Sequence, residues 1–173
     1  MKNISKTNNA LASNQKTNMQ VKNKTMTILA LDLGTNAGWA ILKNGSIRYG
    51  TVVFKRTICE GAGMTFLKFK RWLEVFNNIA GLDAVYFEEV RRHLGTDAAH
   101  SYGGFLSQLT AFCEEMEIPY QGVPVGTIKK HITGKGNASK VQVIESVKLL
   151  GFDPKDDNSA DALALLNLVI AKH

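Results

Sequence analysis

The sequence of 173 residues has only two cysteines, and its apolar runs are all far shorter than a membrane span. A helix that crosses a bilayer needs about 20 consecutive apolar residues. The N-terminus also lacks the apolar segment of a secretory signal, so we expect a cytoplasmic protein. Cys59 and Cys113 lie far apart and outside any CxxC or Cys/His cluster. This spacing argues against a structural zinc site and indicates free buried thiols in a reducing compartment.

Acidic residues are missing from positions 1–31, where five lysines supply most of the net charge of +6. Residues 1–25 are mainly Asn, Lys, Ser, Thr and Gln, which bury too little apolar surface to offset the entropy of ordering. We predict a disordered basic tail at 1–25 and a single domain at 26–173, whose 45% hydrophobic content suits one core. Three interpretations of the tail stay open: a basic arm for a polyanion, an extended start before Met19 or Met26, and, less favoured, an organelle transit peptide.

From Met26 onward, strand-like and helix-like periods alternate along the chain. Asn44-Gly45 is a strong signal for a tight hairpin. Three antiparallel strands followed by strands that alternate with helices predict an α/β fold with a mixed five-stranded sheet flanked by helices. The expected strands are 28–33, 38–42, 47–54, 84–88 and 120–125, and the expected helices are 64–79, 97–116, 139–150 and 157–171.

The expected helix at 97–116 has an unusually wide apolar face. Gly103 and Gly104 lie within this face and remove side-chain bulk, so that another backbone could approach closely. The face is interpreted either as buried on the protein's own sheet or, in part, as the seam of a two-fold dimer.

Three carboxylates, Asp32, Glu88 and Asp161, each lie in an apolar run on a separate predicted element. Burying an unpaired carboxylate is costly, so such groups usually meet a cation. If the fold brings the three together, they form an oxygen-only site suited to Mg²⁺ or Mn²⁺.

Four short motifs occur in an order and spacing that is specific when they are taken together. They are DLGTNAGWA at 32–40, FEEV at 87–90, GKGNASK at 134–140 and DNSADALA at 157–164. The sequence resembles the RuvC-type Holliday junction resolvases of the ribonuclease H-like superfamily, especially their phage-type relatives, over about 28–168. The resemblance implies a homodimeric, metal-dependent endonuclease of a bacterial or phage-infected cell that resolves four-way DNA junctions by paired symmetric nicks, in DNA recombination and repair. The apolar face of helix 97–116 is the expected seam of that dimer, and the short apolar runs predict no membrane partner.

The resemblance also implies two Mg²⁺ ions per site, with Mn²⁺ as an alternative. Asp32 would bridge the ions, while Glu88 and Asp161 would each hold one. Two ions about 4 Å apart activate water and relieve charge on the leaving oxygen in phosphodiester hydrolysis.

The fourth acidic ligand of the family departs from the pattern here. Bacterial RuvC sequences have an acid three positions before the last aspartate, and Asn158 occupies that position. Asp157 shares a helix face with Asp161, so we assign it as the fourth catalytic and metal-binding residue. Two alternatives stay open: Asn158 as a neutral ligand, and Asp157 as a helix N-cap.

Basic residues near the motifs predict contacts with the DNA backbone. Glycines in segment 129–140 expose backbone N–H groups, Ser139 can cap the next helix, and a helix N-terminus favours phosphate. Lys135 and Lys140 match lysines of the family motif. The alternative is an ordinary solvated basic loop. The expected DNA-binding residues are Lys129, Lys130, Lys135, Lys140, Arg91 and Arg92.

Other classes of function fit the sequence less well. An ATP-binding domain of the actin and sugar-kinase type also reads Asp-x-Gly-Thr, but it needs a second such domain that the chain has no room for. A related nuclease for other branched DNA or structured RNA would use the same catalytic residues. The Asn158 departure also leaves open a protein that binds junctions without cutting them.

Overall fold

The structure is a computed structural model that describes residues 26–91 and 95–172. The predicted tail at 1–25 and the predicted DNA-binding residue Arg92 lie outside the described residues. No helix in the described ranges is both long and apolar enough to cross a bilayer. The strands are β1 Ile28–Asp32, β2 Asn36–Lys43, β3 Ser46–Val53, β4 Ala84–Glu89 and β5 Tyr120–Pro124, and the helices are α2 Met64–Ala80, α3 Thr96–Glu115, α4 Val125–Thr133, α5 Lys140–Leu149 and α6 Asp157–Ile170.

The five strands form one mixed sheet in the order β3-β2-β1-β4-β5. The β1–β2 and β2–β3 pairs are antiparallel, whereas β1–β4 and β4–β5 are parallel. Asn44 and Gly45 both have positive φ values, 51° and 75°, as a tight hairpin between β2 and β3 requires. The predicted fold class, including the hairpin, is confirmed.

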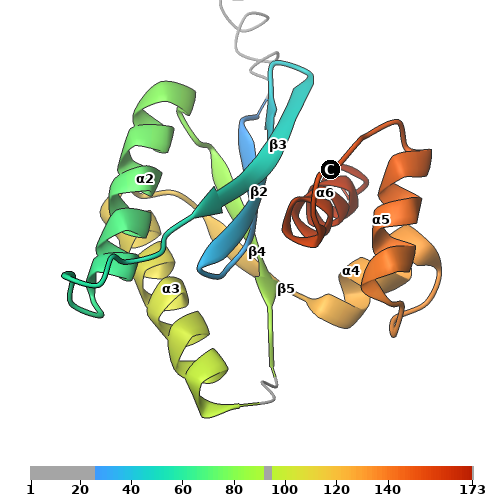
Figure 1. The fold of residues 1–173 in the computed structure, drawn as a ribbon. Coiled ribbons are helices and arrows are strands. Elements are labelled where there is room, and N and C mark those ends of the chain that lie inside the picture. The colour runs from blue at the N-terminus through green and yellow to red at the C-terminus, as the bar shows by residue number, and fades with distance from the viewer. Residues whose placement is uncertain (1–25, 92–94, 173) are drawn as a thin grey trace, which may run out of the picture.

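Helices cover both faces of the sheet, with α2 and α3 on one side and α4, α5 and α6 on the other (Figure 1). Alternation along β1 explains the two cores, because neighbouring residues of a strand face opposite sides. Leu29 and Leu31 pack in the core under α2 and α3, whereas Ile28 and Ala30 pack in the core under α6. Strand β1 is therefore apolar along its length until Asp32, as expected for a strand buried on both faces.

Helix α6 is buried nearly all round because it lies between the sheet and helices α4 and α5. Its first turn comes so close to β2 that a Cβ atom on Gly38 would lie 1.9 Å from the Asn158 carbonyl oxygen. The N-terminal end of α6 is thereby held against β2 beside the end of β1. This contact places the acidic residues of α6 beside the end of β1.

Two details of the sequence interpretation are wrong. Residues 125–133 form helix α4 rather than a strand end and a basic segment. The sequence pattern of α4 is weak, because only Ile128 is fully buried and Gly126 suggested a break in the helix. Cys59 is exposed rather than buried, whereas Cys113 is buried as expected. On α3, a Cβ atom added to Gly104 would meet the ring of Phe66 on α2 at 2.3 Å, so this glycine packs against the protein's own helix.

Candidate metal centre

Asp32, Glu88 and Asp161 meet at one end of the sheet. Asp32 ends β1, and Glu88 lies near the end of the neighbouring parallel strand β4, where Leu31 is paired with Phe87. Asp161 reaches the same point from the second turn of α6. One carboxylate oxygen from each of the three lies within 4.8 Å of the others, and all three side chains are partly buried. The structure thus brings together the three acids that the sequence singled out.

Each of these carboxyl groups is difficult to ionise in the folded protein. Burial, followed by the charge of Asp161, raises the pKa of Asp32 to about 7. Burial and the charge of Asp32 raise the pKa of Glu88 to about 8. Burial raises the pKa of Asp161 to about 6. Three converging carboxylates are costly unless a cation neutralises them, so the charge balance of the site favours a bound cation.

The donor set fits a hard divalent cation. All three side chains offer oxygen atoms, which Mg²⁺ and Mn²⁺ prefer, and the described residues near them provide no cysteine or histidine to the group. Asp32, Glu88 and Asp161 could therefore hold such an ion together.

Asp157 has a different partner. Its carboxylate accepts a hydrogen bond from Lys140 on α5, which holds the pKa of Asp157 below and that of Lys140 above the ordinary range. Among the described residues, Asp157 does not belong to the group of acids within 4.8 Å of one another. Asp157 is also not the N-cap of α6. Asp156 is the N-cap, and its side chain accepts a hydrogen bond from the Ser159 N–H at 2.8 Å.

The side chain of Asn158 is a direct neighbour of Asp32. Its amide group lies 3.3 Å from both Asp32 Oδ2 and the Asn36 carbonyl oxygen. Both neighbours are acceptors, so the orientation that satisfies them turns the amide nitrogen of Asn158 toward Asp32. Asn158 can therefore orient Asp32 directly.

The sequence matches no protein-family model, and no curated protein sequence is detectably similar to it. Solved structures do resemble it. RuvC from T. thermophilus in complex with a Holliday junction substrate is 23% identical, with a TM-score of 0.69 over 82% of this chain and 90% of that one. A second Thermus thermophilus RuvC structure is 25% identical, with a TM-score of 0.63 over 81% and 90%. The yeast mitochondrial Holliday junction resolvase Ydc2 is 13% identical, with a TM-score of 0.58 over 82% and 76%.

This chain has the RuvC-type fold. The predicted ribonuclease H-like class is confirmed, whereas the phage-type branch stays a prediction. The resemblance extends over about four-fifths of the chain.

Two of the predicted basic residues lie close enough to influence the acids of this RuvC-type fold. The charges of Lys129 and Lys140 both lower the pKa of Glu88 and of Asp161. Lys129 also donates to the Ala138 carbonyl oxygen at 2.9 Å, which ties α4 to the loop before α5. A positive potential therefore borders the acidic cluster.

The other predicted DNA-binding residues are more peripheral. Lys130 is exposed near the end of α4, and Lys135 is exposed in the loop between α4 and α5. Arg91 is paired with Glu89 at 3.2 Å. Ser139 caps α5 as predicted and forms a reciprocal capping box with Gln142.

Tyr102 on α3 is a neighbour of the site that the sequence interpretation did not identify. Its hydroxyl donates to the Glu88 carbonyl oxygen at 3.0 Å and accepts from the Val90 N–H at 3.3 Å. The hydroxyl of a partly buried tyrosine needs a hydrogen-bond partner, and that requirement was the available signal. Tyr102 thus fixes the backbone of β4 where Glu88 projects.

Proposed function

We propose that this protein is a metal-dependent endonuclease that resolves four-way DNA junctions by paired symmetric nicks. The observation that carries the proposal is the convergence of three partly buried carboxylates, within 4.8 Å, on a RuvC-type fold. The similar RuvC structure in complex with a Holliday junction substrate supports junction DNA as the substrate class.

Asp32, Glu88 and Asp161 are the proposed catalytic residues, and they would hold two Mg²⁺ ions, with Mn²⁺ as the alternative. When bound, such ions activate a water molecule and stabilise charge on the leaving oxygen. Asp157 stays the sequence-based prediction for the fourth ligand. The 3.3 Å approach of Asn158 to Asp32 supports Asn158 as its rival.

The protein's own charges prepare this chemistry. The raised pKa values of the three acids mean that the site takes up a proton or a cation at neutral pH. Lys129 and Lys140 provide positive charge beside the acids, suited to the phosphate that is cut. Lys130, Lys135 and Arg91 would contact phosphates farther along the DNA, and Arg92 stays a prediction.

Symmetric cleavage of a junction needs two sites related by a two-fold axis. We propose a homodimer through the α3 segment predicted from the sequence, 97–116. Gly103 on this helix is exposed, and a Cβ atom added to it would meet no other atom within 4 Å. This opening supports the close approach of a second copy at Gly103.

The test is cleavage of a labelled, immobile four-way junction against a linear duplex of the same sequence, with Mg²⁺ and with EDTA. We expect paired nicks on opposite strands of the junction, lost in EDTA and in Asp32→Asn. Asp153→Asn is the matched control, because Asp153 is an exposed carboxylate paired with Lys155 away from the cluster.

Two outcomes would replace the proposal. Tight binding of the junction without any cutting would indicate a junction-binding protein. Equal cutting of the duplex, of other branched DNA or of structured RNA would leave a related nuclease without junction selectivity.

A further inference from the structure

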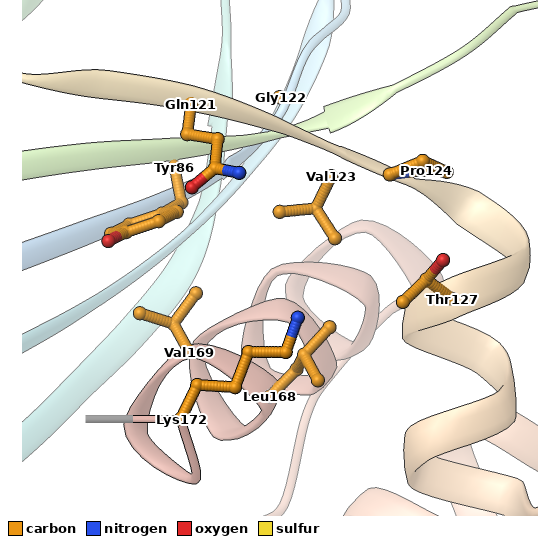
Figure 2. Close-up of a pocket in the computed structure, with 9 residues that line it drawn as sticks. All are labelled: Tyr86, Gln121, Gly122, Val123, Pro124, Thr127, Leu168, Val169 and Lys172. Carbon is orange, nitrogen blue, oxygen red and sulfur yellow. The ribbon is translucent and has the colours of Figure 1, made fainter.

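A groove of about 400 Å³ lies between the edge strand β5 and the C-terminal part of α6. Tyr86, Gln121 and Val123 from the sheet face Leu168 and Val169 from the helix across it (Figure 2). Val169 lies eight residues beyond Asp161, which is about 12 Å along a helix axis. The helical wall of the groove at Val169 is therefore distant from Asp161, whereas Val123 on the sheet side is the ladder partner of Glu88.

The groove combines an apolar interior with unpaired polar groups. Val123, Leu168 and Val169 are buried and belong to the core under α6. The side chains of Gln121, Thr127 and Lys172 are exposed around this interior and make no hydrogen bond or ion pair with any described residue. Figure 2 shows the Lys172 ammonium and the Gln121 amide directed into the space between β5 and α6.

The charge of the groove has one sign. Among the described residues that line the groove, Lys172 carries a positive charge, and none is an aspartate or glutamate. An unpaired cation beside an apolar surface favours a ligand that carries a carboxylate next to an apolar group.

Strand β5 borders the groove with an open edge. It is the last strand in the sheet order and pairs only with β4 among the described strands. The Pro119 carbonyl accepts from the Val85 N–H, so alternation along the strand turns the N–H and C=O groups of Tyr120 and Gly122 away from β4. These groups can pair with another extended chain.

We propose that β5 and this groove form a docking site for an extended acidic peptide segment of a partner protein. The segment adds a strand to the outer edge of β5, inserts an apolar side chain against Val123 and Leu168, and pairs a carboxylate with Lys172. The open backbone edge favours a peptide over a nucleic acid, because a phosphate backbone cannot continue a β-ladder.

The chain's own N-terminal segment does not suit this site on charge. Residues 1–25 contain five lysines and no Asp or Glu. A partner with acidic residues is complementary to Lys172, whereas this segment would repel it.

Proline at the end of β5 limits the added strand to a few residues, because Pro124 has no N–H to offer.

The test begins with a display library of random peptides selected on the full-length protein. We expect enriched peptides in which Asp or Glu accompanies alternating apolar residues. Binding of a synthesised, fluorescent copy of such a peptide is then measured by anisotropy. Lys172→Glu should weaken its binding by about tenfold, and a copy with Lys in place of its acids should bind that variant better than wild type.

Lys148→Glu is the matched control, because Lys148 is an exposed lysine on α5 outside the groove. It should leave peptide binding unchanged, and the peptide should slow hydrogen exchange at the amides of Tyr120 and Gly122. Junction cleavage by Lys172→Glu should match wild type, which separates this proposal from the catalytic one. The proposal is overturned if no peptide is enriched, if enriched peptides bind Lys172→Glu as well as wild type, or if protection appears away from β5. It is also overturned if Lys172→Glu weakens junction binding instead, since the groove would then belong to the DNA surface.

Discussion

Gly38 on β2 and Asn158 on α6 touch backbone to backbone, so that a Cβ atom on Gly38 would lie 1.9 Å from the Asn158 carbonyl oxygen. Gly38 is also the ladder partner of Asp32 across the β1–β2 pair. The same glycine therefore fixes the distance between the first turn of α6, which leads to Asp161, and the strand end that carries Asp32. The lack of a side chain at Gly38 therefore sets the spacing between Asp32 and the acidic residues of α6.

Gly38→Ala should disrupt this arrangement. The Asn158 carbonyl must move by about 1 Å, since Cβ atoms keep about 3.0 Å from other heavy atoms. We expect a loss of about 1–3 kcal/mol in the free energy of unfolding, as for overpacked cores. Cleavage should fall by about 100-fold, because misplacement by about 1 Å can cost that much.

Urea unfolding and junction cleavage measure the two effects. Gly61→Ala is the control, because a Cβ atom there meets nothing within 4 Å, and it should change the free energy of unfolding by less than about 0.5 kcal/mol. Wild-type cleavage by a stably folded Gly38→Ala protein would contradict the role given to this contact.

Stability without metal should fall as the pH rises. In the unfolded state, Asp and Glu release their protons at about pH 4. In the folded state, Asp32, Glu88 and Asp161 have pKa values of about 7, 8 and 6, so they keep their protons to a higher pH. The folded state thus holds protons that the unfolded state has lost, so the contribution is full below about pH 4 and is lost as the pH rises through 6–8. Thermal unfolding in EDTA from pH 5 to 9 measures this slope.

Mg²⁺ should oppose that loss, because a divalent ion replaces the protons and binds only the folded site. We expect the melting temperature at pH 8 to rise with Mg²⁺ and to change little at pH 5. Asp32→Asn should flatten the pH dependence in EDTA. An equal response to Mg²⁺ at both pH values would show that the ion acts elsewhere.

The fourth ligand can be identified with two variants. Asp157 is occupied by Lys140, whereas the Asn158 amide lies 3.3 Å from Asp32. We therefore expect Asn158→Ala to weaken Mn²⁺ binding by about 10–100-fold, a typical cost for groups that orient metal ligands, and Asp157→Asn to weaken it less. Titration calorimetry measures both affinities. The reverse order would support the sequence-based assignment of Asp157.

Lys140 should contribute to DNA affinity through its charge. We expect Lys140→Met to weaken junction binding and to reduce the slope of log affinity against log salt by about 1, as for the loss of one phosphate contact. Fluorescence anisotropy across a salt series in EDTA measures this slope. Lys148→Met, an exposed lysine on the same helix, is the control and should leave the slope near that of wild type. An unchanged slope in Lys140→Met would restrict Lys140 to its pair with Asp157.

The fold was predictable where periodicity is long. Helix α2 was expected at 64–79 and occurs at Met64–Ala80, and the Asn44-Gly45 turn is present with both residues in the left-handed region. Helix α4 was missed because nine residues with one buried position give too short a pattern, and Gly126 interrupts it.

The three acids were predictable because a carboxylate inside an apolar run is conspicuous. Their neighbours were less so. Three adjacent residues at the start of α6 have different roles that only the geometry of the helix distinguishes. Asp156 caps the helix, Asp157 pairs with Lys140, and Asn158 lies beside Asp32. Tyr102 and Gly38 act through contacts between distant segments, which local patterns do not encode.

The most direct test of the proposed centre is an anomalous difference map from a crystal of the protein soaked in MnCl₂. We predict density for manganese bounded by the carboxylates of Asp32, Glu88 and Asp161, with Asn158 or Asp157 as the further ligand. Manganese bound only at other acids, with these three carboxylates left without an ion, would contradict the account.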